Sequence, residues 1–329
     1  MIFLTTRYNE NYVIRGGTNM KKTKKYLEDY LDDCLLRKRL SQKTIRAYRI
    51  DLKQYFDFIG TSKDDLKKIN EYIHFLNKQY SKYKTVKRKI ASIKAFYSYL
   101  EYEEIIAFSP FRKIRTKIKE PKMLPKIIQK KYLNQIFQWL FNNLDVANTE
   151  YGKKLAIRNI TIIELLFSTG IRISELCNIR IKDINFQDRS LKIFGKGSKE
   201  RVLYLGNDQV IQSLEKYIEL NKNIDEENNY LFLNKFNTQL SEQTVRILLK
   251  NIEKDLNLSI HITPHMFRHT FATTLLEKEV DIRYIQNILG HSSISTTQIY
   301  THVTYPKQKE ILIKKNPMND YKNSDFQSI

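Results

Sequence analysis

Apolar side chains recur at every third or fourth position through the first hundred residues, which is the spacing of one face of an α-helix. Four such segments follow one another, and we expect helices at 21–39, 41–59, 62–76 and 81–100. Ser41 is placed to cap the second helix and Gly60 to end it, while Ser62 with Asp65 resembles a capping box for the third. This part of the chain is therefore expected to form a small helical bundle.

Basic residues are in large excess, with 57 Lys and Arg against 36 Asp and Glu and a formal net charge of +21. Residues 1–120 hold 28 basic and 14 acidic residues, so the first third of the chain carries most of this excess. The fourth helical segment places a basic set opposite its apolar stripe, namely Lys82, Lys84, Lys87, Arg88 and Lys94. Such a surplus attracts polyanions, of which nucleic acid is the commonest, although a lysine-rich proteome would produce the same excess.

The composition excludes several classes of protein. With nine glycines, none of them five positions apart, a phosphate-binding GxxxxGK loop cannot form, and Glu200 breaks the dinucleotide pattern after the GxG at 195–197. We expect neither ATP-driven nor nicotinamide-linked chemistry, no membrane span and no secretory signal. Two cysteines, Cys34 and Cys177, provide no disulfide framework and fit a reducing cytoplasm.

Three of the six prolines fall within 109–125, a charged stretch without periodicity that is typical of a linker. We expect five parts: an N-terminal extension without a fixed fold, a first domain, a linker, a second domain and a tail, at 1–19, 20–108, 109–127, 128–304 and 305–329. In the second domain and the tail, helices are expected at 129–142, 154–167, 171–178, 208–220, 241–255, 264–277, 281–289, 295–300 and 306–314. Strands at 190–194 and 201–205 flank a glycine-containing turn, which predicts one antiparallel hairpin.

The densest cluster of polar residues begins the helix expected at 264–277. His265 and Arg268 are three positions apart and share a face of that helix. His265 and His269 have the spacing of a metal pair, but the zinc-hydrolase pattern requires Glu where this chain has Met266, so we expect no metal site. A histidine beside an arginine is usually an ordinary surface pair, so the cluster alone does not establish catalysis.

Other candidate positions flank glycines. Gly290 is placed to end a helix in the left-handed conformation and to turn His291 into a loop, and Tyr300 follows nine residues later. Arg172 stands just beyond another glycine, with Glu175 one turn further on. Taken alone, these two would be an exposed helical ion pair, and most of the 21 tyrosines must be structural.

Four motifs together, TGIRISEL, GKGSKER, ITPHMFRHTFATTLLE and ILGHSSISTTQIYTHV, resemble the tyrosine site-specific recombinases of the phage integrase family, in particular its Xer-like branch. The resemblance extends over nearly all of the chain after about residue 20. The six active-site positions that it implies are Arg172, Lys196, His265, Arg268, His291 and Tyr300, with Glu175 supporting them. One conservative departure is Phe267, where the family usually has leucine.

The resemblance implies a mainly α fold, in which a four-helix SAM-like DNA clamp precedes an α+β catalytic domain with a small antiparallel sheet. It adds Arg46 and Arg49 to the basic set as candidate DNA contacts. The implied activity cuts and rejoins duplex DNA through a 3′-phosphotyrosine and a Holliday junction, without metal, ATP or another cofactor. The implied partners are DNA with paired half-sites and further recombinase subunits, in a homotetramer on two synapsed sites or with a partner recombinase. The expected location is the bacterial cytoplasm, at the nucleoid.

Two other classes compete with this interpretation. A non-catalytic DNA-binding module would not require Tyr300, Lys196 and two arginines together. A type IB topoisomerase has a similar site but acts as a monomer and relaxes supercoils. The compact clamp and the tail after Tyr300 favour a recombinase. Relatives dock their last helix on the adjacent protomer, and packing on its own domain is the alternative for the helix at 306–314.

Overall fold

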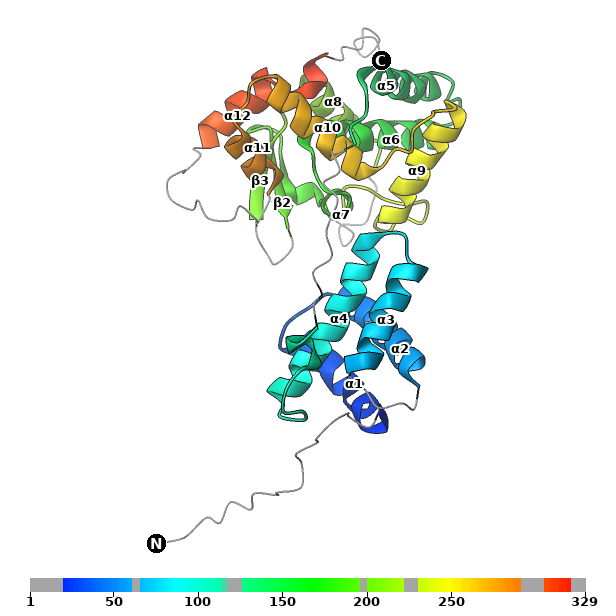
Figure 1. Cartoon of the computed structure of the whole chain (residues 1–329). Helices are drawn as coiled ribbons and strands as arrows, with labels where there is room; N and C mark the ends of the chain where they lie inside the picture. Colours follow the sequence, from blue (N-terminus) through cyan, green and yellow to red (C-terminus); the bar gives the residue numbers. More distant parts are fainter. Residues whose placement is uncertain are drawn as a thin grey trace. The chain divides into compact units, whose positions relative to one another are not determined.

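The computed structural model describes residues 20–60, 66–114, 116, 126–195, 200–221, 230–290 and 305–320. The chain divides into two compact units, Met1–Met123 and Leu124–Ile329, which are described separately below (Figure 1). The division falls within the stretch that the sequence predicts as a linker. Within the described ranges, no helix is long and apolar enough to cross a membrane.

The described residues of the first unit form four α-helices, as the apolar spacing predicts. They are α1 (Met20–Leu36), α2 (Gln42–Ile59), α3 (Leu66–Gln79) and α4 (Tyr83–Tyr102). Ser41 caps α2 by accepting a hydrogen bond from the Thr44 backbone nitrogen, and Gly60 ends the helix with φ at 63°. The capping pattern expected at Ser62 and Asp65 lies outside the described residues.

Aromatic side chains fill the core of the first unit. Tyr30, Tyr55 and Phe96 are fully buried, and the Tyr55 hydroxyl shares a 2.8 Å hydrogen bond with the Tyr97 hydroxyl. Phe111 belongs to the same core, and so does Ile114. The stretch expected as a linker, 109–127, therefore begins with a folded segment, because these two apolar side chains pack in the core of the bundle. The prolines and charges of the same stretch indicate only a connecting segment.

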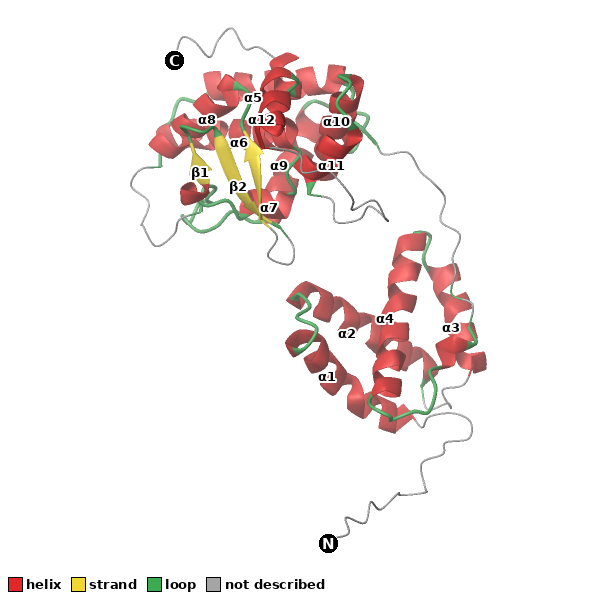
Figure 2. Cartoon of the chain, turned by 90° about the vertical axis from the view of Figure 1, so that its left-hand side faces the viewer, coloured by secondary structure: helices red, strands yellow, loops and turns green. Residues whose placement is uncertain are grey.

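The described part of the second unit is mostly helical, with one small sheet. Its longer helices are α5 (Lys130–Asp145), α6 (Glu150–Thr169), α8 (Asp208–Glu219), α9 (Glu242–Asp255), α10 (Pro264–Glu277), α11 (Ile282–Leu289) and α12 (Tyr305–Lys314), and a single turn forms α7 (Ile173–Cys177). The expected helix at 295–300 lies outside the described residues. The antiparallel strands β1 (Ile184–Asn185), β2 (Ser190–Phe194) and β3 (Glu200–Tyr204) lie in that order, drawn in yellow in Figure 2. The two longer strands match the predicted hairpin. Strand β1 has only two residues, so the sequence shows no alternation from which it could be predicted.

Helix α6 is the centre of the second unit, where it packs against α5, α8 and α10. All ten residues from Ile160 to Thr169 are buried, so the helix is enclosed on every side over this stretch. Gly170 follows with φ at 61°, and a Cβ there would lie 2.6 Å from Cδ1 of Phe271. Glycine is thus required at this position both by the backbone conformation and by the close packing of α10.

The tail packs on its own unit. Ile311 and Leu312 of α12 are buried, as is Met318 in the short 3₁₀ segment that follows. A Cβ on Gly206 would lie 1.8 Å from the Leu312 carbonyl oxygen, so the α12 backbone approaches the end of the sheet as closely as only glycine permits. The sequence is compatible with docking on a neighbour or on the same chain, and the structure has the second arrangement.

Candidate active site

Arg172 stands at the entrance to α7, two residues beyond Gly170. Its Nη1 donates a 2.7 Å hydrogen bond to Oε1 of Glu175, and its Nη2 donates a 3.0 Å bond to the carbonyl oxygen of Gly290. About a third of the side chain remains exposed, at 34%. One part of the guanidinium is thus held by the protein, while another part faces solvent.

Arg268 lies on α10 and is 5% exposed. Its Nη1 donates to the Gly170 carbonyl oxygen at 2.8 Å, and its Nη2 donates to the Leu289 carbonyl oxygen at 2.6 Å. Burial lowers the pKa of Arg268 to about 10, and the nearby charge of Arg172 acts in the same direction. Because this pKa is well above neutral pH, Arg268 remains positively charged there, and its charge lies close to that of Arg172.

Glu175 is the acidic partner of this pair of arginines. Both terminal nitrogens of Arg201 donate hydrogen bonds to its carboxylate, at 2.9 Å to Oε1 and 2.7 Å to Oε2. The backbone nitrogen of Arg172 also donates to Oε2, at 3.0 Å. Burial raises the pKa of Glu175, but the hydrogen bonds and charge of Arg201, together with the bonds from Arg172, lower it to about 2. The carboxylate is therefore ionised at all physiological pH values.

Three arginines hold the last carbonyl groups of α11. Arg201 Nε donates to the Ile288 oxygen at 3.1 Å, and the next two carbonyls along the chain, Leu289 and Gly290, accept from Arg268 and Arg172. The last carbonyls of a helix have no partner within the helix and carry a partial negative charge, so they suit cationic donors. This carbonyl end, residues 288–290, therefore gathers all three guanidinium groups.

Arg201 is not among the site residues predicted from the sequence, although it lies within one of the four motifs. Its signal is the strand period: Arg201, Leu203 and Leu205 alternate along β3 and its end, and both leucines are buried. A charged side chain on the inner face of a strand must find a partner there. That partner is Glu175, from a separate motif.

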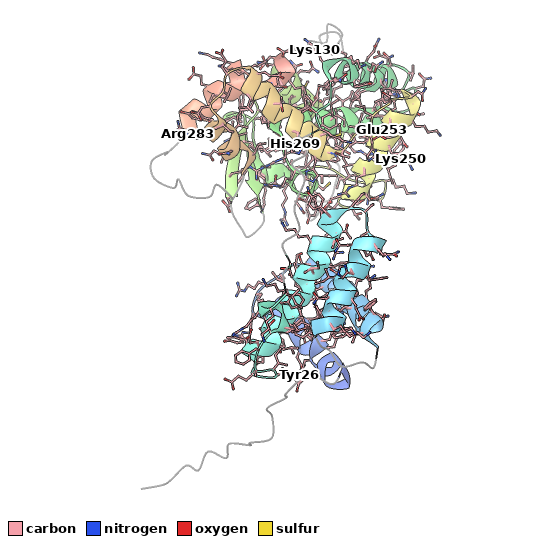
Figure 3. All side chains as sticks on the ribbon, in the orientation of Figure 1. Tyr26, Lys130, Lys250, Glu253, His269 and Arg283 are labelled. Atoms are coloured by element: carbon pink, nitrogen blue, oxygen red, sulfur yellow. The ribbon has the colours of Figure 1, made fainter. Side chains whose placement is uncertain are left out.

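His265 and His269 are both exposed on α10, and Figure 3 labels His269 on this helix. Partial burial lowers the pKa of His269, and the neighbouring His265 and Arg268 add to the effect. Among the residues that the structure describes, no three His, Cys, Asp or Glu side chains are grouped as metal ligands.

Of the six implied active-site positions, the structure places three: Arg172 and Arg268 at the carbonyl end of α11, and His265 in the first turn of α10. Lys196, His291 and Tyr300 lie outside the described residues. Their described flanks are the facing ends of β2 and β3 and Gly290, which caps α11 with φ at 64°.

The candidate DNA contacts of the first unit are all exposed: Arg46, Arg49, Lys82, Lys84, Lys87, Arg88 and Lys94. Arg88 also forms an ion pair with Asp51, a fully buried residue of α2. Asp51 further accepts hydrogen bonds from Lys89, at 3.0 Å, and from Ser92, at 2.9 Å. A buried polar cluster that the apolar pattern does not reveal thus joins α2 to the helix that carries most of the basic set.

Comparison with known proteins identifies both units. Residues 134–307 match the phage integrase family, and residues 27–104 match the phage integrase N-terminal SAM-like domain. The chain is 48% identical to a tyrosine recombinase of Agathobacter rectalis over 92% of this chain and 99% of that protein. It is 36% identical to tyrosine recombinase XerD of Staphylococcus saprophyticus, over 88% of this chain and 98% of the relative.

Solved structures share the fold. A lambda integrase tetramer bound to a Holliday junction gives a TM-score of 0.65 at 18% identity, covering 85% of this chain and 76% of that one. XerH recombinase in a post-cleavage complex with palindromic difH DNA gives 0.64 at 21% identity, covering 82% and 78%. With a family match over more than half of its length and a curated relative at 48% identity, this chain belongs to the phage integrase family of tyrosine recombinases.

Proposed function

We propose that this protein is a site-specific recombinase that cuts and rejoins duplex DNA through a 3′-phosphotyrosine intermediate and a Holliday junction. The observation that supports this most directly is the pairing of Arg172 and Arg268 around residues 288–290, with the ionised Glu175 behind them. Both guanidinium groups are permanently charged and planar, which suits the non-bridging oxygens of a phosphodiester. Negative charge that develops on those oxygens during cleavage would be stabilised by them.

Tyr300 is the proposed nucleophile. Its phenolic oxygen attacks the phosphorus, the bond to the 5′-oxygen breaks, and a 3′-phosphotyrosine and a 5′-hydroxyl result. Lys196 gives the leaving 5′-oxygen its proton, and His265 assists proton transfer at the tyrosine, whose ordinary pKa of about 10 makes it a weak nucleophile. His291 donates a hydrogen bond to the phosphate.

Rejoining reverses these steps. The phosphotyrosine keeps the energy of the broken phosphodiester, so a 5′-hydroxyl from the partner duplex can attack it without ATP. The cationic side chains stabilise charge that a metal ion stabilises in other nucleases and polymerases. Glu175 is proposed to orient Arg172 by its hydrogen bonds to that residue's side chain and backbone.

The DNA substrate is proposed to be a duplex with paired half-sites, gripped by the exposed basic set of the first unit. Domain roles follow: residues 20–108 act as a clamp and residues 128–304 as the catalytic domain. A homotetramer on two synapsed sites, or an assembly with a partner recombinase, is supported by the lambda integrase tetramer on a Holliday junction. We place this activity in the bacterial cytoplasm, at the nucleoid.

The test is covalent trapping on a nicked substrate. Wild-type protein should form an adduct that survives a denaturing gel, and Tyr300→Phe should bind the same duplex without forming it. Tyr305→Phe, five residues further along, is the matched control and should form the adduct normally. Adduct formation by Tyr300→Phe would disprove the assignment.

A type IB topoisomerase uses the same chemistry but does not require a specific DNA site, and this difference distinguishes it from a recombinase. Plasmid without a recombination site should remain supercoiled in the presence of this protein. Rapid relaxation of such plasmid would favour the topoisomerase, and loss of cleavage in EDTA would show that a metal ion takes part.

A further inference from the structure

A cavity lies in the second unit, away from the arginines of the candidate active site. It has a volume of about 360 Å³ and is bounded by the first half of α6, the end of α8 and the segment 233–237. This volume falls within the range of small-molecule sites. Along α6, Thr169 lies eleven positions after Arg158, which corresponds to about 17 Å at 1.5 Å per residue.

Arg158 forms part of the wall of this cavity. Its Nη1 donates to the Leu233 carbonyl oxygen at 2.9 Å, and its Nη2 makes a long 3.4 Å contact with the Asn159 amide oxygen. Its Nε is buried and has no hydrogen-bond partner among the described residues. Both of its acceptors are neutral, so within the described part of the chain the charge of this half-buried guanidinium is not compensated by a carboxylate.

Two further cationic side chains line the cavity. Lys154 and Lys235 line the cavity with Arg158, and none of the described residues that line it is acidic. Lys154 forms a 3.5 Å ion pair with the largely exposed Glu150, a kind of surface pair that contributes little to stability. Since an uncompensated, partly buried charge is costly, Arg158 in a cavity wall that also holds two lysines indicates a site that an anion completes.

Aromatic rings adjoin these cations. Tyr151 lines the cavity and is 61% exposed, which leaves its ring available to a ligand. Tyr217 is buried and fixed, because its ring stacks on Phe232 with centroids 5.4 Å apart and its hydroxyl accepts a hydrogen bond from the Leu233 backbone nitrogen. A planar ring could stack on Tyr151 while an attached anion reaches Arg158.

We infer that this cavity binds a small phosphate monoester carrying a planar ring, of the nucleoside monophosphate class. Arg158 and the two lysines would bind the phosphate, whose double negative charge matches three cations better than a single carboxylate does. Tyr151 would cover the base. This inference does not depend on the proposed recombination chemistry, because none of its residues belongs to the candidate active site.

The experiment is calorimetric titration of the full-length protein with AMP, inorganic phosphate, ribose 5-phosphate and adenosine, at constant ionic strength. AMP is expected to bind most tightly, phosphate and ribose 5-phosphate more weakly, and adenosine not measurably. Arg158→Met should weaken AMP binding by about tenfold or more, the loss expected for a charge-assisted hydrogen bond. Arg246→Met, at an exposed arginine of α9 paired with Glu242, is the matched control and should leave binding unchanged.

Each alternative result has a defined meaning. Equal affinity for phosphate and AMP would overturn the nucleoside part of the inference, and absence of binding by any of the anions would overturn the whole. Equal affinities of Arg158→Met and Arg246→Met would show that the anion binds elsewhere. Lys235→Gln, at an exposed position, serves if Arg158→Met does not fold; it should weaken AMP binding by about threefold, and unchanged affinity would count against the site.

Discussion

Glu164 is a carboxyl group enclosed in the core of the second unit, and it predicts an unusual dependence of stability on pH. It lies on α6 with no exposed surface. Its Oε1 accepts a 2.7 Å hydrogen bond from Nε2 of Gln209, and its Oε2 has no partner among the described residues. Burial raises the pKa of Glu164 from 4.5 to about 8.

The direction of the effect follows from where the proton is held. Between pH 4.5 and pH 8, the folded protein retains this proton and the unfolded chain releases it, so the free energy of unfolding falls as pH rises. The slope approaches about 1.4 kcal/mol per pH unit for one proton. At pH 7 the accumulated loss is about 3 kcal/mol relative to pH 4. Glu164→Gln keeps the shape of the side chain and cannot ionise, so it should remove this contribution.

The assay is urea unfolding at several pH values, followed by the fluorescence of Trp139. This is the only tryptophan of the chain, and it packs against the core of the second unit, so its signal reports on that unit. Glu164→Gln should unfold at higher urea than wild type at pH 8, and the difference should shrink towards pH 5. The control is Glu215→Gln, at an exposed position of α8. Parallel pH profiles for wild type and Glu164→Gln would refute the reasoning.

Four further outcomes are expected. Lys196→Ala should cleave ordinary DNA slowly but recover on a 5′-bridging sulfur substrate, because a thiolate leaves without a proton. An equal loss of single-turnover rate relative to wild type on both substrates would make Lys196 a positioning residue. Replacing Lys84 and Lys94 by Gln should reduce the salt dependence of DNA binding, measured by anisotropy, by roughly one unit of slope for each phosphate that is no longer neutralised, and an unchanged slope would leave this face merely solvated. Arg201→Lys should retain DNA affinity but lower the single-turnover cleavage rate by about 10- to 100-fold, which is the effect expected from the loss of one charge-assisted hydrogen bond. An unchanged rate would show that the bidentate interaction of Arg201 with Glu175 is not needed for cleavage. Deleting 305–320 should lower the calorimetric Tm by several degrees, because the buried apolar side chains of the tail are removed, and an unchanged Tm would mean that the tail does not stabilise its own unit.

Apolar spacing is sufficient to predict the helices of both units, because each buries one face or is wholly enclosed. Helix α6 shows the limit of this signal. Its stretch from Ile160 to Thr169 is buried on every side although it includes Glu164, and the range expected from spacing, 154–167, is shorter than the helix itself, so neither its full length nor its central place is predictable. The 3₁₀ segment at Phe111 escapes prediction because its prolines and charges are also typical of linkers. Strand β1, at two residues, is too short for any period.

Within the described part of the site, the sequence predicts Arg172 and Arg268, but neither Arg201 nor the contacts that join the three arginines. Arg172 and Arg268 stand out through their motifs, and the structure adds what joins them, namely backbone carbonyls nearly 120 positions away from Arg172. Spacing cannot reveal such contacts, because they depend on how α7, α10 and α11 meet. The same holds for Asp51 and Lys89, where two charges are buried because each satisfies the other.

The capping of α11 by three guanidinium groups changes how an arginine substitution there should be interpreted. Arg172→Ala removes a positive charge and, at the same time, a donor that holds the chain immediately before His291. A reduced cleavage rate in this variant therefore has two causes, the lost positive charge and the displaced backbone. Each cause can be reversed by a different experiment. Guanidinium ion added to the solution could restore the charge at the vacated position, but it would not tether residue 290. Citrulline at position 172 would do the reverse, because it is neutral and keeps an N–H donor at the same reach.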